Sequence, residues 1–209
     1  MLAATTTKDT GALPPAVIVA MCALAFTVLS FWWLNARQGR LKSYVPHTFA
    51  AAVTPERTLV RLPVILFNTG PKPIVVQNLR LAFLGVGQSV RVLSWRTTRD
   101  RIRPEREDDP RLPSVFVVNG RTAIQLFVEF GVPFPDFIPD PREYAASIEC
   151  KVGHRKNWFK LLEFTLRLQN MTSPGSYIPY SNETVEVSAS EVERALTELQ
   201  SLRAKAAVD

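Results

Sequence analysis

Two hydrophobic patterns divide the chain. Residues 14–34 form one uninterrupted apolar run, in which Thr27 and Ser30 are the only polar side chains from residue 16 onward. From about residue 47 to residue 187, apolar and polar residues instead alternate with a period of two. A continuous apolar run of this length predicts a membrane-spanning helix, whereas alternation predicts half-buried β-strands. We therefore expect an anchor followed by a β domain.

The apolar run has the length and the borders of a membrane helix. Its 21 residues would rise about 30 Å as an α-helix, which matches the hydrocarbon thickness of a bilayer. Pro14 and Pro15 stand where a first helical turn tolerates proline, and Trp32 and Trp33 stand where aromatic rings prefer lipid headgroups. A cleavable signal peptide is the alternative, but it would have a shorter apolar region and a basic leader.

Basic residues on the two sides of the apolar run predict its orientation. Arg37, Arg40 and Lys42 follow the run closely, whereas Lys8 alone precedes it. The positive-inside rule puts the more basic side in the cytoplasm. We therefore expect a cytoplasmic β domain. The opposite orientation, with the domain outside as part of an envelope or secretion complex, is the alternative.

The expected division of the chain follows from these patterns. Residues 1–13 would be a short extracytoplasmic leader, and residues 14–34 the transmembrane helix. Residues 35–46 would be a basic juxtamembrane linker held to anionic lipid, before a β domain at 47–187 and a helix at 188–206. The residues expected at the membrane interface are Trp32, Trp33, Arg37, Arg40 and Lys42.

Three runs show the strand pattern most clearly. The polar segment 153–157 joins the last two of them and predicts a β-hairpin. Further strands are expected at 49–53, 58–67, 74–84, 89–97, 115–118 and 184–187. The inward positions of the three runs are Thr122, Ile124, Leu126, Val128 and Phe130, then Tyr144, Ala146, Ile148, Cys150 and Val152, then Leu162, Phe164, Leu166 and Leu168.

The number of strands and the absence of helices between them predict the fold class. Seven or eight short antiparallel strands must close around one core, as a two-sheet sandwich or a small barrel. We expect a mainly β fold of the immunoglobulin-like sandwich kind. Residues 62–70 (LPVILFNTG) and 73–81 (PIVVQNLRL) resemble the opening strands of immunoglobulin-like domains in uncharacterised bacterial membrane-anchored proteins. This resemblance implies a fold and carries no activity with it.

The end of the chain predicts an amphipathic helix. Ser188 and Glu191 have the spacing of a capping box, and apolar residues then recur at intervals of three and four up to Leu202. We expect the apolar stripe to pack on the β domain. An oligomer contact between helices is the alternative, although two heptads are few for a coiled coil.

Charge and cysteine content exclude few classes of function. The net charge is +6, but the basic residues form no block interleaved with aromatics, so we expect no nucleic-acid partner. Cys22 lies in the predicted span and Cys150 in a predicted strand. They cannot meet, so no disulfide is expected.

Few residues could carry chemistry. Any Cys–His or metal site must use His47 or His154, because these are the only histidines. A Cys150–His154 nucleophile or a copper site of His47, Cys150 and His154 is the alternative reading. Since Cys150 is in phase with core residues and His154 lies in a polar link, we expect no catalytic, cofactor or metal site.

Two loops are candidates for binding. Residues 99–111 (RDRIRPEREDDPR) carry balanced charges, which is typical of a solvated loop. Residues 131–141 contain Phe134, Phe137 and Ile138, which would either pack over the end of the domain or contact a partner. The function expected from these observations is a non-catalytic, membrane-tethered interaction or scaffold module. A metal-binding or enzymatic domain is a further alternative.

Overall fold

The computed structural model describes residues 14–206 except 87–88, 104–108 and 154, so the expected leader lies outside the described residues. The chain divides into two compact units, 1–38 and 39–209. The first contains helix α1 (Pro15–Phe31), which continues into a π-helical turn, η1 (Trp32–Ala36). This helical segment of 22 residues has a mean hydropathy of 2.3 and is long and apolar enough to cross a membrane.

The local sequence explains why α1 forms without a protein neighbour. Pro15 occupies the first turn, where its missing N–H costs no hydrogen bond. The hydroxyl of Thr27 donates to the carbonyl of Ala23 at 2.8 Å, so this polar group is satisfied inside the helix. No residue of α1 is buried. The helix therefore satisfies the Thr27 hydroxyl internally and presents an apolar surface that no part of the protein buries.

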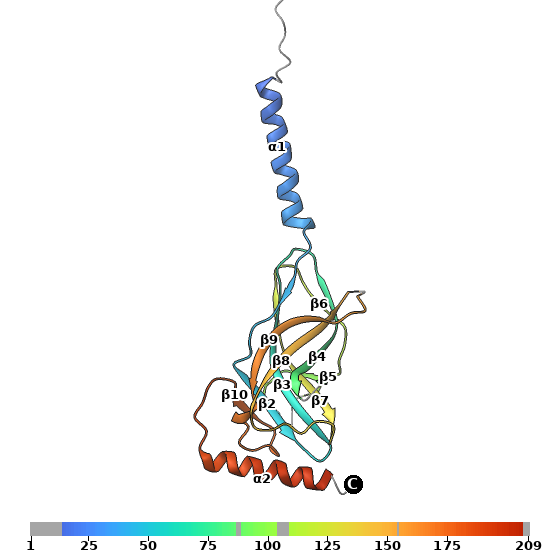
Figure 1. The fold of residues 1–209 in the computed structure, drawn as a ribbon. Coiled ribbons are helices and arrows are strands. Elements are labelled where there is room, and N and C mark those ends of the chain that lie inside the picture. Colours follow the sequence, from blue (N-terminus) through green and yellow to red (C-terminus); the bar gives the residue numbers. More distant parts are fainter. Residues whose placement is uncertain (1–13, 87–88, 104–108, 154, 207–209) are drawn as a thin grey trace, which may run out of the picture. The chain divides into compact units, whose positions relative to one another are not determined.

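The second unit is built from ten strands and a C-terminal helix (Figure 1). Its elements are β1 (Leu41–Lys42), β2 (Thr48–Val53), β3 (Arg57–Asn68), β4 (Ile74–Val86), β5 (Ser89–Arg99), β6 (Phe116–Val118), β7 (Ala123–Pro133), β8 (Glu143–Val152), β9 (Phe159–Arg167), the short 3₁₀ turn η2 (Leu168–Asn170), β10 (Ile178–Ser181) and α2 (Ala189–Ala206).

The strands form one continuous antiparallel sheet, curled into a half-barrel. Its order is β10-β2-β3-β7-β5-β4-β8-β9, with β1 beside β3 and β6 beside β4. The mainly β class is confirmed, but the immunoglobulin-like division into two sheets is not. Bulges interrupt the pairing of β4 with β5, β4 with β8, β5 with β7, and β8 with β9. Such bulges bend strands, so one sheet can wrap around its own core.

Alternation in the sequence identifies the inner face of this sheet. Positions predicted to face inward on β7, β8 and β9 lie in the core, and the hairpin between β8 and β9 is confirmed. Thr122 is an exception, because it is exposed in the turn before β7. The strand expected at 184–187 is also wrong. The chain pairs with β2 earlier, through β10, and the next residue, Asn182, bonds to β9 through its side chain.

Asn182 joins the two ends of the curled sheet. This buried residue follows the edge strand β10 and reaches the other edge strand, β9. Its side chain donates to the carbonyl of Thr165 at 3.0 Å and accepts from the amide of Arg167 at 2.9 Å. These are the groups with which a further strand would pair. The amide side chain therefore substitutes for a strand neighbour where the curl meets itself.

Helix α2 lies at the end of the β domain opposite to β6 (Figure 1). The predicted capping box is present, with the Glu191 amide donating to the Ser188 hydroxyl and the Ser188 amide donating to the Glu191 carboxylate. Leu199 and Leu202 are buried in the core cluster. Arg203 binds Asp140 at 2.6 Å. The helix therefore packs against the β domain of its own chain.

Candidate functional site

A buried charged pair lies on the outer face of the sheet. Arg61 on β3 and Glu129 on β7 are cross-strand partners, and their side chains are 0% and 8% exposed. The Arg61 guanidinium donates to Glu129 at 2.9 Å and to the carbonyls of Arg101 and Ile102 at 2.9 and 3.1 Å. The segment after β5 therefore covers this outer face through its backbone.

Two further side chains donate hydrogen bonds to the Glu129 carboxylate. The Tyr177 hydroxyl donates to one carboxylate oxygen at 2.6 Å, and the Thr97 hydroxyl donates to the other at 3.2 Å. The Arg61 guanidinium also stacks 4.9 Å from the centre of the Tyr177 ring. Both oxygens of Glu129 are therefore engaged, which fits a structural role better than that of a general base.

Burial and hydrogen bonding act oppositely on Glu129. Burial alone would raise the pKa of its carboxyl, but hydrogen bonds from Tyr177 and Arg61, together with the charge of Arg61, leave the pKa below its usual value. Burial and the Glu129 charge raise the pKa of Tyr177, so its hydroxyl stays protonated and donates. The Arg61–Glu129 pair is therefore ionised at neutral pH, and its hydrogen bonds hold four segments of chain together: β3, β7, β5 with the residues after it, and the residues before β10.

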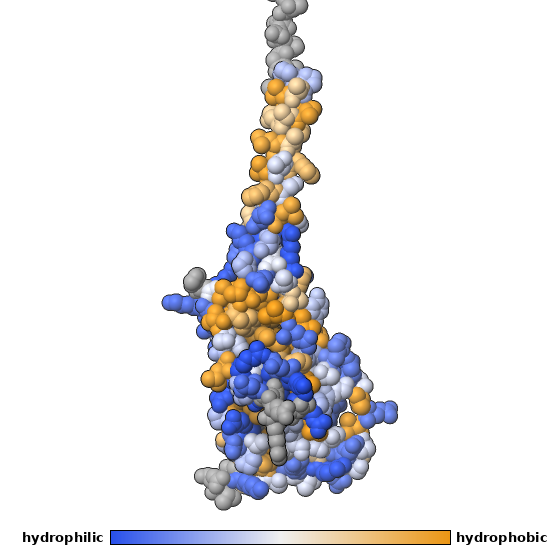
Figure 2. Space-filling model, turned by 180° about the vertical axis from the view of Figure 1, so that it is seen from behind, coloured by the Kyte–Doolittle hydropathy of each residue, from blue (hydrophilic) through white to orange (hydrophobic). Residues whose placement is uncertain are grey.

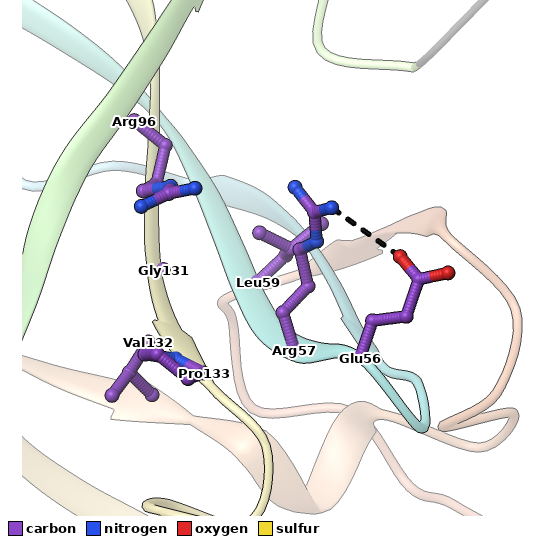
Figure 3. Close-up of a pocket in the computed structure, with 7 residues that line it drawn as sticks. All are labelled: Glu56, Arg57, Leu59, Arg96, Gly131, Val132 and Pro133. Atoms are coloured by element: carbon purple, nitrogen blue, oxygen red, sulfur yellow. Dashed lines mark hydrogen bonds and ion pairs between the residues drawn. The ribbon is translucent and has the colours of Figure 1, made fainter.

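A small hollow of about 130 Å³ lies beside this network (Figure 3). Gly131 pairs with Leu59 next to the Arg61–Glu129 pair, and a Cβ at Gly131 would come within 2.7 Å of Leu59. The hollow is smaller than most ligand pockets. The one carboxylate that lines it, that of Glu56, accepts a hydrogen bond from Arg57 at 3.3 Å. It offers no acid–base pair. Its lining residues are Glu56, Arg57, Leu59, Arg96, Gly131, Val132 and Pro133.

Four segments meet at the end of the sheet where the chain enters it. Asn68 is fully buried there, and its side chain donates to the carbonyls of Lys72 and Val118 at 2.8 and 3.2 Å. The Thr69 amide donates to the Arg40 carbonyl, and the Gly153 amide donates to the Val75 carbonyl. We call this end, formed by residues 39–45, 68–75, 117–123 and 151–158 without residue 154, the basic end. Asn68 thus fixes the turns at 68–75 and 117–123 to each other, and backbone bonds join the other two segments to the first.

Glycines let these turns approach closely. A Cβ at Gly120 would lie 1.8 Å from the Pro71 carbonyl oxygen, and one at Gly39 would lie 2.2 Å from the Gly70 nitrogen. Both contacts involve backbone, which cannot move aside as a flexible side chain can. The basic end is therefore a closely packed set of turns.

The predicted interface residues fall in both units. Trp32 and Trp33 are exposed on η1, and the Arg37 guanidinium lies 4.1 Å from the centre of the Trp33 ring. Arg40 and Lys42, expected in a linker, belong to the β domain, where Lys42 pairs with Phe67 across β1 and β3. Their side chains are exposed.

The predicted partner loop packs against the core. Phe137 is only 6% exposed and lies 5.0 Å from Phe83, measured between ring centres. Phe134 and Ile138 are partly buried against the same cluster. The exposed apolar residues lie elsewhere. Figure 2 shows that hydrophobic residues gather on part of one face of the β domain. The exposed large apolar residues in β6 and near it are Val75, Leu112, Val115 and Val117.

The residues considered for chemistry are not brought together. His47 is exposed and contacts Glu183 at 2.6 Å. Cys150 is fully buried in the core, and burial raises the pKa of its thiol to about 12. His154 lies outside the described residues. Among the residues that are described, no group of three or more His, Cys, Asp or Glu side chains could hold a metal ion.

No known protein family matches the chain, and no curated protein matches its sequence. A protein from Archaeoglobus fulgidus is similar in structure over 69% of this chain and 100% of its own, with 11% identity and a TM-score of 0.35. A family 123 glycoside hydrolase from Clostridium perfringens, studied for glycolipid glycan hydrolysis, is similar over 52% of this chain and 20% of its own length, with 13% identity and a TM-score of 0.29. At these TM-scores neither likeness carries an argument. The expected membrane-anchored immunoglobulin-like class is not confirmed.

Proposed function

We propose that the chain is a non-catalytic module, tethered to a membrane by Pro15–Ala36, whose β domain holds a protein partner at the bilayer surface. One observation carries the proposal, which is that no residue of α1 is buried. An apolar surface of this size is not stable in water and belongs in lipid. Tethering then raises the effective concentration of the domain near partners on the same membrane.

Two features support a role without catalysis. Burial holds the Cys150 sulfur as a thiol, whereas a nucleophilic cysteine needs thiolate character. Glu129 is fully engaged by hydrogen-bond donors.

The surface expected to contact the partner is apolar. The exposed valines Val75 and Val117 pair across β4 and β6. Exposed apolar patches commonly mark protein-binding sites, and cross-linking from residue 117 would capture the partner.

Membrane fractionation tests the anchor. The full-length chain is expected in the membrane pellet, to resist an alkaline wash and to be released by detergent. The variant Leu24→Arg/Leu29→Arg should leave the pellet, because each central arginine costs about 2.5–3.5 kcal/mol on insertion. The control Leu24→Val/Leu29→Val should stay in it.

Two results would contradict the anchor. The first is recovery of the intact chain in the soluble fraction without detergent. The second is a mature chain that begins after the helical segment, which would identify a cleaved signal peptide. N-terminal sequencing of the recovered protein separates the two.

A further inference from the structure

The four segments of the basic end carry a charge of one sign. They contain seven lysine and arginine residues and no aspartate or glutamate. Six of the seven side chains are exposed, and Lys151 is half-buried beside Trp158. The seven residues are Arg40, Lys42, Lys72, Arg121, Lys151, Arg155 and Lys156.

At least two of these charges, those of Lys72 and Lys156, meet no carboxylate among the described residues. Elsewhere in the β domain, Arg61, Arg80 and Arg167 bind carboxylates. Because the segments come from distant parts of the sequence, their common charge cannot be read from a local run. It arises when the fold brings four turns together.

Chain length limits how far this end can be from lipid. Only Arg37 and Gln38 separate the helical segment from Gly39, where the β domain begins. Two residues reach at most about 7 Å. That distance is shorter than the Debye length of about 8 Å at physiological salt, so charges on the bilayer surface still act there.

We propose that the basic end of the β domain docks on anionic lipid headgroups, so that the domain rests on the membrane in one fixed orientation. The inference rests on the proposed anchor and adds a second contact to it. Exposed lysines and arginines bind anionic leaflets electrostatically. Hydrogen bonds of Asn68 hold the turns that contain Lys72 and Arg121 together, and Val75, in the same segment as Lys72, is exposed.

A quenching experiment on the full-length chain in lipid nanodiscs tests the proposal. In a Cys22→Ser background, a fluorophore is placed at the basic end by Asn119→Cys, and on α2 by Gln200→Cys as a control. Both sites are exposed. The discs contain a nitroxide-headgroup lipid in either phosphatidylcholine alone or phosphatidylcholine with phosphatidylserine.

The expected result is stronger quenching at residue 119 when phosphatidylserine is present, with no such difference at residue 200. Lys72→Glu/Lys156→Glu should reduce quenching at residue 119 to the phosphatidylcholine level. The matched control Arg194→Glu/Lys205→Glu changes the same charge on exposed residues of α2 and should leave it unchanged. Raising the salt to about 1 M shortens the Debye length to about 3 Å and should act like the first variant.

Each contrary result is distinct. Equal quenching in both lipids, or no effect of Lys72→Glu/Lys156→Glu, would overturn the lipid contact while leaving the anchor in place. Failure of the chain to enter discs at all would instead overturn the anchor. Loss of the quenching on adding RNA at constant salt would assign the charges to nucleic acid and would also overturn the proposal.

Discussion

At the scale of single residues, Arg61 is the most informative side chain. It occupies an outward position on β3, yet it is fully buried. Alternation alone would have left it in solvent, because nothing in a strand pattern reveals that backbone carbonyls after β5 will cover it. The available signal was a lone arginine in an apolar strand and a lone glutamate in another. Only the register of β3 with β7 makes them partners.

Removing one member of this pair should be costly. Arg61→Met leaves Glu129 buried without its cation, and we expect a loss of about 3–5 kcal/mol in the free energy of unfolding. The double variant Arg61→Met/Glu129→Leu should be more stable than Arg61→Met, because it removes both charges. Denaturant unfolding in detergent, followed by tryptophan fluorescence, to which the buried Trp95 contributes, measures both. A double variant less stable than either single one would contradict the assignment.

The same pair predicts a dependence on pH. The folded pKa of Glu129 lies below its usual value, so the unfolded chain binds its proton first as the pH falls. The stabilisation from Glu129 should therefore be complete above the unfolded pKa of about 4.3 and disappear as the pH falls through the lower folded value. Glu129→Gln, compared over the same acid range, should lack this component.

At the scale of elements, strand existence could be predicted and strand neighbours could not. The alternation on β7, β8 and β9 gave the inward residues because each strand carries that information in its own sequence. The pairings of β3 with β7 and of β5 with β7 join distant segments, and no local pattern specifies them. For the same reason, one curled sheet could not be distinguished from two.

Local stereochemistry predicted α2 well, and its packing gives a direct test. Leu199 is 1% exposed, whereas Leu196 on the same helix is 37% exposed. Leu199→Ala should weaken the docking of α2 by about 2–5 kcal/mol, because it leaves a cavity. Leu196→Ala should change it by less than about 0.5 kcal/mol. Hydrogen exchange of the α2 amides compares the two. Equal exchange would contradict packing and favour an oligomer contact.

At the scale of the whole molecule, composition predicted the apolar helix but not the basic end. The net charge of +6 looked diffuse along the sequence. Folding concentrates part of it, because Asn68 holds together the turns that contain Lys72 and Arg121, and Gly153, close to Lys156 in the sequence, bonds to Val75. A charge pattern assembled from four segments depends on topology. It is therefore invisible to a search for basic runs.

The orientation of the chain is also a whole-molecule prediction. The excess of arginine and lysine after the apolar run favours a cytoplasmic β domain. A reporter that is active only in the cytoplasm, fused after Asp209, should be active. A reporter that is active only after export should be silent at the same site. The reverse result would place the domain in an extracytoplasmic complex.

The closure by Asn182 has a consequence for the membrane-tethered chain that we propose. Molecules that diffuse in two dimensions collide often, and an unpaired strand edge invites edge-to-edge growth into aggregates. Because the side chain of Asn182 occupies the outward carbonyl of Thr165 and the outward amide of Arg167, a neighbouring copy finds that stretch of β9 already taken. In the membrane-tethered chain that we propose, one amide thus keeps neighbouring copies from pairing along that stretch of β9.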